Sequence, residues 1–285
     1  MSHALFGPSG NPDAFYEEGH KKSLEMPAWV KAMGLTTYEY QCAKGVKISP
    51  ATAEELGKNA KEAGISLSIH APYYLNLATD GERRASAVDY IIQTMRAATH
   101  MGADRIVVHT GACAKISREE ALFLAKGTMQ LALDTADEMG LGHVHICPET
   151  MGKINQLGTP EEVFELCQLD ERLIPCIDFG HVHARSIGAV STYEDFSKLF
   201  DSLENMLGKE RAKHFHSHMS RIEYTLKGGE KKHWRYEDTQ FGPDFDPIAR
   251  LICERDLSPR VICESAGTQG KDAKIFQEIY ESFLK

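Results

Sequence analysis

Short apolar runs alternate with long amphipathic segments along almost the whole chain, and this alternation limits the possible folds more than any other feature. The expected strands cover residues 4–7, 36–41, 66–70, 105–109, 143–149, 174–178, 213–219 and 260–264. The expected helices cover residues 13–33, 51–64, 82–102, 118–140, 160–168, 192–207, 246–256 and 271–284. Eight strand–helix repeats favour parallel strands joined by right-handed crossovers. We therefore predict an α/β protein in which residues 1–285 form a single domain, a (β/α)8 TIM barrel.

One segment interrupts this rhythm. Residues 220–245 are polar, long and without periodicity, and they separate the seventh expected strand from the seventh helix. Connections of this length inside a compact domain are usually functional or disordered. Because TIM-barrel enzymes keep their chemistry at the carboxyl ends of the strands, we expect this long loop to lie over the active site.

Charge and composition narrow the class of protein. The formal net charge is −9, which argues against a generally basic surface for nucleic acid but leaves room for a local positive groove. No run of residues approaches the roughly 18 apolar residues of a membrane helix, and the first residues lack the pattern of a secretory signal. The seven cysteines form no CxxC pair. We expect reduced thiols, a cytoplasmic location, and neither a membrane nor an obligatory protein partner.

Side chains that bind metals stand at the ends of six of the eight expected strands: His70, His109, Glu149, Asp178, His218 and Glu264. A single histidine or glutamate at a strand end is more often capped, solvated or ion-paired. Agreement at six strand ends is improbable by chance, and the carboxyl ends of barrel strands converge on one face. Mixed imidazole and carboxylate ligands suit zinc and are also compatible with manganese or iron. The pattern predicts a metal centre.

Further histidines surround these positions. Asp178 and His181 form a DxxH pair just after the sixth strand, which could serve neighbouring cations. In the seventh strand, His214, His216 and His218 share one face. Only His218 should reach the rim; we expect His216 to lie behind it in the core, with metal ligation as the lesser alternative.

Two more motifs lie near the expected site. Tyr73, Tyr74 and Asn76 follow His70 directly, and the tyrosines could stack on bases or sugars, or merely pack the barrel mouth. The long loop offers further candidate ligands and a group of cations: Glu230, His233, Lys227, Lys231, Lys232 and Arg235. A solvated face explains these cations about as well as attraction of phosphate does.

Taken together, these residues resemble the endonuclease IV family of DNA repair enzymes that act at apurinic/apyrimidinic sites, within the xylose-isomerase-like barrels. The resemblance covers the chain from about residue 60 onward and is weaker before that. It rests on His70-x-x-Tyr73-x-x-Asn76-Leu77, His109-Thr-Gly111, ICPETMG around Glu149, CIDFGH from Cys176 to His181, HMSRIEYT from His218, and VICES around Glu264.

The resemblance implies three cation sites. His70 and His109 would hold the first, and Glu149 would bridge to a second held also by Asp178, His218 and Glu264. His181 and His233 would hold the third. The family places an aspartate two residues before that last histidine, whereas this chain has Lys231, so Glu230 is the candidate substitute. The loop after the second strand, Tyr40 to Lys44, lacks the family's glutamine–arginine element, for which Lys44 or Lys47 could substitute.

The function that the resemblance implies is hydrolysis of the phosphodiester on the 5′ side of an abasic site in double-stranded DNA. Two or three Zn²⁺ ions, with Mn²⁺ as a possible replacement, would act with the catalytic residues Glu149, Asp178 and Glu264. The expected DNA contacts are Tyr73, Tyr74, Asn76, Lys44, Lys231, Lys232 and Arg235.

Two alternatives stay open from the sequence. A xylose-isomerase-like sugar isomerase or epimerase would need one divalent cation, held by Glu149, Asp178, His218 and Glu264; the four additional imidazoles have no evident use there. A metal-binding or adaptor barrel without catalysis is the other alternative, and the lysine at position 231 is its only support.

Overall fold

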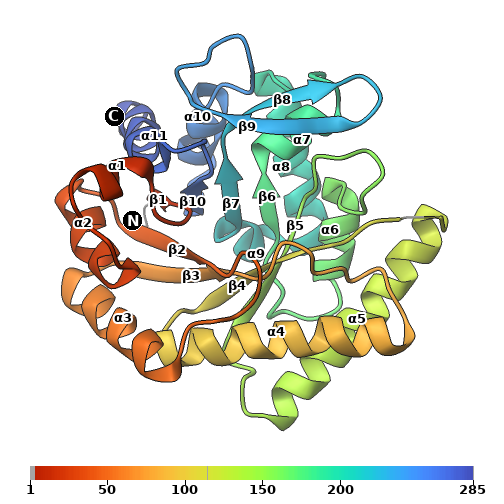
Figure 1. The fold of residues 1–285 in the computed structure, drawn as a ribbon. Coiled ribbons are helices and arrows are strands. Elements are labelled where there is room, and N and C mark those ends of the chain that lie inside the picture. Colours follow the sequence, from red (N-terminus) through yellow and green to blue (C-terminus); the bar gives the residue numbers. More distant parts are fainter. Residues whose placement is uncertain (1–3, 114, 285) are drawn as a thin grey trace.

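The structure is a computed structural model that describes residues 4–113 and 115–284, and its main feature is an eight-stranded parallel sheet rolled into a barrel (Figure 1). The barrel strands are β1 (Leu5–Pro8), β2 (Thr37–Gln41), β3 (Ser66–His70), β4 (Arg105–His109), β5 (His145–Glu149), β6 (Cys176–Asp178), β7 (His216–Met219) and β10 (Arg260–Cys263). Their order in space is β1-β10-β7-β6-β5-β4-β3-β2. The predicted TIM barrel is confirmed.

The barrel closes at a seam between β1 and β2. The amide of Gly10 donates to the carbonyl of Glu39 at 2.9 Å, and the amide of Thr36 donates to the carbonyl of Phe6 at 3.0 Å. A Cβ atom on Gly7 would lie 1.6 Å from the carbonyl oxygen of Thr37. Only glycine at this position lets the two backbones approach so closely.

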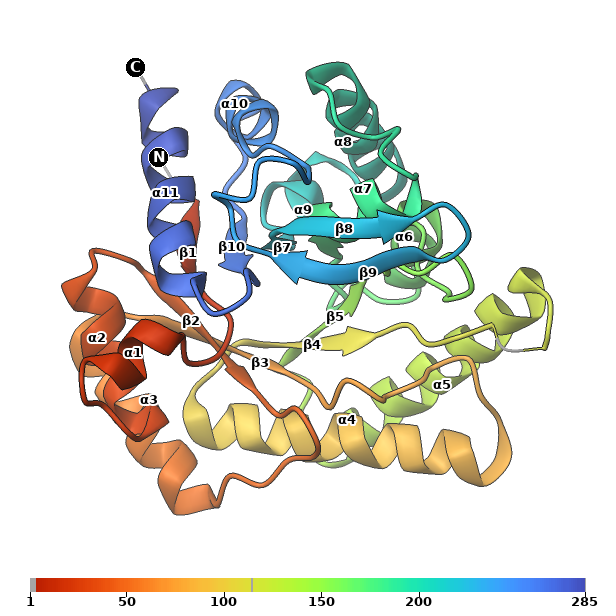
Figure 2. The ribbon, with the colours of Figure 1, turned by 45° about the horizontal axis from the view of Figure 1, so that its top comes forward.

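Helices cover the outside of the barrel (Figure 2). They are α1 (Asp13–Glu17), the short 3₁₀ helix η1 (Ser23–Glu25), α2 (Met26–Ala32), α3 (Pro50–Ala63), α4 (Gly81–Met101), α5 (Arg118–Glu138), α6 (Pro160–Cys167), α7 (Phe179–Arg185), α8 (Tyr193–Leu207), α9 (Lys209–Lys213), α10 (Asp246–Glu254) and α11 (Gln269–Ser282). Ser117 and Thr159 cap α5 and α6 by accepting from amides of the first turn. Among the described residues, no helix is both long and apolar enough to cross a membrane.

Two sequence predictions are wrong in their local detail. The expected helix over residues 13–33 is divided into α1, η1 and α2, because Gly19 has a φ of +94° and Pro27 stands at the start of α2. The segment 220–245, expected to lack regular structure, contains an antiparallel hairpin of β8 (Arg221–Thr225) and β9 (Gly229–Trp234). Helices α7 and α9 were not expected.

The hairpin carries a bulge that decides which residues face the barrel. Glu223 pairs with Lys232, but the next residue, Tyr224, pairs with Glu230, so Lys231 is an extra residue in β9. Because side chains alternate along a strand, one extra residue brings Glu230 and His233 to the same side. The hairpin follows β7 after one residue, Ser220, and lies beyond the carboxyl ends of β6 and β7 (Figures 1 and 2).

Candidate metal centre

The six predicted strand-end side chains converge in one cluster at the carboxyl ends of the barrel strands, and Glu149 lies at its centre. The Oε2 atom of Glu149 lies 3.4 Å from Nε2 of His70 and 3.3 Å from Nε2 of His109. Its Oε1 atom lies 2.8 Å from Nδ1 of His218 and 3.6 Å from Nδ1 of His181. One carboxylate therefore touches four imidazoles while only 1% of its surface is exposed.

Potential ligand atoms of the described residues gather in five groups, and within each group they lie within 4.8 Å of one another. Three of them match the sites that the resemblance implies and are called the first, second and third ligand groups: His70, His109 and Glu149; Glu149, Asp178, His218 and Glu264; and His181, Glu230 and His233. The other two, His70 with His218 and Glu264, and Cys176 with His216 and His218, overlap with the second ligand group at His218. Glu149 belongs to the first and second ligand groups, which suits a carboxylate that bridges two cations.

Each imidazole of the three ligand groups turns one ring nitrogen toward the carboxylates of the site. The other nitrogen bonds to a neighbouring group: Nδ1 of His70 to Ala71 O (2.7 Å), Nδ1 of His109 to Tyr73 O (2.7 Å), Nδ1 of His181 to Thr150 O (2.9 Å), Nε2 of His218 to Glu39 Oε1 (3.0 Å), and Nδ1 of His233 to Ser220 Oγ (2.8 Å). Metal-binding histidines are commonly held in this way, because the outer bond fixes both the tautomer and the ring orientation.

Asp178 supplies a direct test of whether a cation fits. Its Oδ1 atom accepts from the amide of His181 at 2.7 Å and so caps α7. Its Oδ2 atom is buried and has no hydrogen-bond partner. An unsatisfied buried carboxylate oxygen is costly. A divalent cation between Asp178, Glu149, His218 and Glu264 would satisfy it, so the residues present fit a metal ion.

The carboxylates of the site favour positive charge on the imidazoles around them. Burial works against the protonated form of His70, yet Glu149 raises the pKa of this imidazole to about 9. Burial likewise opposes protonation of His181, while Asp178 and Glu230 raise its pKa to about 9. The pKa of Glu149 lies well below its ordinary value despite burial, because His218, His109 and His70 surround it. The pocket is therefore built to hold positive charge.

The third group depends on the bulge and on a glycine. With Lys231 as the extra residue, Nε2 of His181 lies 3.5 Å from Oε2 of Glu230, and Nε2 of His233 lies 3.9 Å from Oε1. A Cβ atom on Gly152 would lie 2.6 Å from Cβ of Glu230. Lys231 itself points away and pairs with Glu223. The lysine that departs from the family's pattern thus stays outside the candidate site.

The residues predicted to contact DNA do not lie together: some are exposed beside the metal centre, and others are paired within loops or the hairpin. Tyr73 and Tyr74 are 56% and 43% exposed beside the pocket, and the amide of Tyr73 donates to Ala43 O at 3.2 Å, so the loop with Lys44 lies alongside. Oδ1 of Asn76 accepts from the amides of Ala78 and Ala112, which ties two loops together. The remaining cations have partners within the hairpin region: Lys232 lies over the ring of Trp234, and Arg235 lies 3.6 Å from Glu237.

Sequence reasoning missed Glu39. This carboxylate is fully buried in β2 and contacts Nε2 of both His216 and His218 at 3.0 Å. The structure places His216 behind His218, where burial lowers its pKa to about 4. A usable signal was present, because Thr37, Glu39 and Gln41 alternate with Tyr38 and Tyr40 and so form a polar face of one strand.

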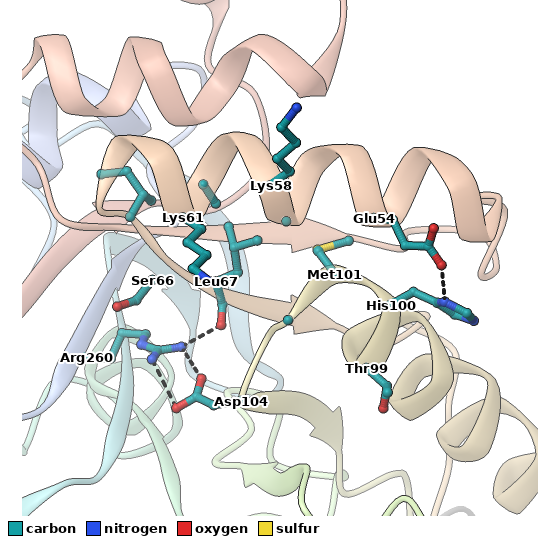
Figure 3. A pocket seen from close by; sticks show the side chains of 14 residues that line it. Glu54, Lys58, Lys61, Ser66, Leu67, Thr99, His100, Met101, Asp104 and Arg260 are labelled. Atoms are coloured by element: carbon teal, nitrogen blue, oxygen red, sulfur yellow. Dashed lines mark hydrogen bonds and ion pairs between the residues drawn. The ribbon is translucent and has the colours of Figure 1, made fainter.

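A separate cavity of about 660 Å³ lies at the opposite end of the barrel, between α3 and α4 (Figure 3). Arg260 is buried there and donates to Leu67 O and to both carboxylate oxygens of Asp104 at 2.9–3.2 Å. Glu54 pairs with His100 at the rim. These charges pair with one another at the amino ends of the strands, where a barrel's polar residues usually serve stability.

The comparisons with known proteins concern the family and the fold. Residues 27–285 match the family model of the xylose isomerase-like TIM barrel. An uncharacterized protein of Methanocaldococcus jannaschii is 34% identical over 264 residues, 92% of this chain and 91% of its own length. A probable endonuclease 4 of Exiguobacterium sibiricum is 30% identical over 215 residues, 71% of this chain and 67% of its own length.

Solved structures share the fold. Endonuclease IV from Thermus thermophilus superposes with a TM-score of 0.71 at 20% identity, covering 100% of this chain and 99% of that one. A D-tagatose 3-epimerase-like protein gives a TM-score of 0.67 at 20% identity, covering 88% of each chain. At this identity the likeness concerns the fold alone, and the two structures carry different names, an endonuclease IV and an epimerase-like protein.

Proposed function

The chain belongs to the xylose isomerase-like TIM-barrel family, and from this premise we propose that it is a metal-dependent endonuclease of the endonuclease IV type. Its substrate is double-stranded DNA with an abasic site, and it hydrolyses the phosphodiester on the 5′ side of that site. The observation that carries the proposal is the presence of three ligand groups in one pocket. A single-cation isomerase would use only the second group.

The cations that we propose are two or three zinc ions, with manganese as a possible replacement. When bound, such ions supply charge neutralisation at a phosphate and activation of a water molecule. Glu149 would hold the first two cations close together, because its two oxygens face different groups of imidazoles. Asp178 and Glu264 would complete the second site, and Glu230, in place of the family's aspartate, would complete the third.

The surroundings of the pocket fit a large substrate better than a small sugar. Tyr73 and Tyr74 stand exposed beside His70, with ring centroids 5.6 Å apart, and could enter the duplex where a base is missing. Unstacking costs least at a damaged position, which would favour abasic sites. Lys44 and the hairpin cations Lys231, Lys232 and Arg235 are proposed to attract phosphates at longer range. Asn76 would act indirectly by holding the loop that carries the tyrosines.

The second candidate function is epimerisation or isomerisation of a sugar. It is favoured by the quartet Glu149, Asp178, His218 and Glu264 and by the likeness to epimerase structures. In that case two carboxylates would move protons beside a carbonyl that one cation polarises.

One experiment separates the two. The zinc-loaded protein is incubated with an end-labelled abasic duplex beside an undamaged duplex, and in parallel with ketohexoses. Cleavage on the 5′ side of the abasic site, with two or more cations per chain by metal analysis, supports the endonuclease. One cation per chain together with sugar turnover and no nicking supports the epimerase and contradicts our proposal.

A further inference from the structure

Two barrel strands, β1 and β2, place no ligand in the metal centre, yet both reach it through a layer of polar side chains. The layer consists of Ser9, Glu39 and Gln41, and it lies next to His218 and Glu264. Glu39 is fully buried, and its hydrogen-bond partners are two imidazoles, the hydroxyl of Ser68 and the amide of Gln41. A buried carboxylate is costly to keep unless its partners compensate for lost hydration, so its position calls for an explanation.

The contacts of Glu39 prevent its carboxylate from turning. Oε1 lies 3.0 Å from Nε2 of His218, while Oε2 lies 3.0 Å from Nε2 of His216 and accepts from Ser68 Oγ at 2.9 Å. An ionised carboxylate only accepts hydrogen bonds. Both nitrogens of the His218 ring face a carboxylate, so both carry protons when no cation is bound. The Nε2 proton stays with Glu39, whereas a cation would displace the proton from Nδ1. That atom faces Glu149 at 2.8 Å and Glu264 at 3.7 Å.

We propose that Glu39 is a positioning residue that makes Nδ1 of His218 the metal-binding nitrogen. The other four imidazoles of the centre are held by a backbone carbonyl or a hydroxyl. Only His218 is held by a carboxylate, which is the stronger acceptor and makes the ring a better ligand. The inference rests on the metal centre of the proposed function but not on the reaction that this centre performs.

The same layer orients a second ligand. Nε2 of Gln41 lies 3.3 Å from Oε1 of Glu39 and donates to Oγ of Ser9 at 2.5 Å. Ser9 in turn donates to Oε1 of Glu264 at 3.1 Å, which leaves Oε2 of Glu264 turned toward His218. Glu39 and Gln41 thus support two ligands of the second group from a strand that contributes none.

The test compares Glu39→Gln with Ser68→Ala in the full chain. Ser68→Ala is the matched control, because it removes one hydrogen bond from Glu39 and leaves the contact with His218 in place. Each metal-free protein is titrated with Zn²⁺ against a competing chelator and, separately, with Co²⁺ followed by its visible absorption. The ring ¹⁵N shifts of His218 report which nitrogen binds the metal.

For Glu39→Gln we expect one cation per chain to bind about 10–100-fold more weakly, with a changed Co²⁺ spectrum and altered ¹⁵N shifts of His218. Ser68→Ala should keep the wild-type affinity and spectrum. Wild-type affinity together with unchanged His218 shifts in Glu39→Gln would overturn the proposal. If Glu39→Gln does not fold, Glu39→Asp replaces it: the charge is kept but withdrawn by one methylene, and a smaller loss at the same cation is expected, whereas no loss overturns the proposal.

These readouts do not depend on catalysis. A wild-type protein that fails to cut abasic DNA contradicts the proposed function and leaves the role of Glu39 open to the metal titration. A Glu39→Gln variant with intact metal binding contradicts the positioning role even if the wild type is an active endonuclease.

Discussion

The substitution Glu149→Gln is the most informative single change, because it removes one charge and almost no volume from the centre of the site. The lost carboxylate contacts four imidazoles and belongs to two of the three ligand groups. Two unit charges 4 Å apart attract each other by about 4 kcal/mol at an effective dielectric constant of 20, and a divalent cation roughly doubles this value. The amide oxygen and water replace part of that attraction. We therefore expect the binding free energy of each of the two adjacent cations to fall by about 4 kcal/mol, which is a loss of about 10³-fold in affinity.

Metal analysis after gel filtration and chelator titration measure this loss directly, and nicking of an abasic duplex measures its consequence. We expect one retained cation per chain, held by His181, Glu230 and His233, and nicking reduced by at least about 10³-fold. Glu138→Gln, a change at an exposed carboxylate at the end of α5, is the control and should behave as wild type. Glu149 does not bridge two cations if Glu149→Gln keeps two tightly bound cations or nicks at the wild-type rate.

Three further predictions address other parts of the structure. Gly152→Ala should displace Glu230 and lower the metal content by one cation per chain, because the added Cβ would lie 2.6 Å from Cβ of Glu230. The control is Gly127→Ala, whose Cβ would lie 3.4 Å from its nearest neighbour and which should keep all cations. Equal metal content in the two variants would contradict the role of Glu230. The folded-state pKa values of His70 and His181, about 9, lie above the ordinary value of 6.5, so these groups stabilise the metal-free protein fully below pH 6.5 and lose that contribution as pH rises through 9. Between pH 6.5 and 9, zinc should bind more tightly as the two imidazoles lose their protons. Denaturant unfolding measures the change in stability across this pH range, and chelator titration measures the change in zinc affinity. If neither quantity changes with pH, the raised pKa values of His70 and His181 are contradicted. Arg260→Met should lower the free energy of unfolding by about 3 kcal/mol, the low end of the range for a broken buried ion pair, because about half of the Asp104 side chain is exposed. Metal content should not change. A variant as stable as the wild type in denaturant would show that the Arg260–Asp104 ion pair does not stabilise the barrel.

The sequence predicted the barrel strands and the converging ligands because both depend on local patterns. Runs such as VICE and CID combine apolar residues that fill a buried strand with a polar residue at its end, and the closed barrel then brings these ends together. Glu39 escaped prediction because it lies in the middle of its strand, and its partners are 177 and 179 residues away along the chain. The alternation along β2 marks Glu39 as part of a polar face, but it does not indicate these distant partners.

The hairpin was missed for a different reason. The extra residue at Lys231 breaks the period of two in β9, so this strand could not be recognised from its sequence as a partner of β8. The same extra residue explains why the sequence indicated Glu230 only as a substitute for the family's aspartate at position 231. Its place beside His181 follows from the bulge, which depends on pairing between the two strands of the hairpin.

The pairing of β1 with β10 has a consequence for folding. These are the first and the last strands of the barrel in the sequence, yet they are neighbours in the sheet. Ser9 donates a hydrogen bond to Glu264, which lies 255 residues further along the chain. The second ligand group is therefore complete only when both ends of the barrel have come together, so the proposed cation there would bind the closed barrel and not a partly folded chain.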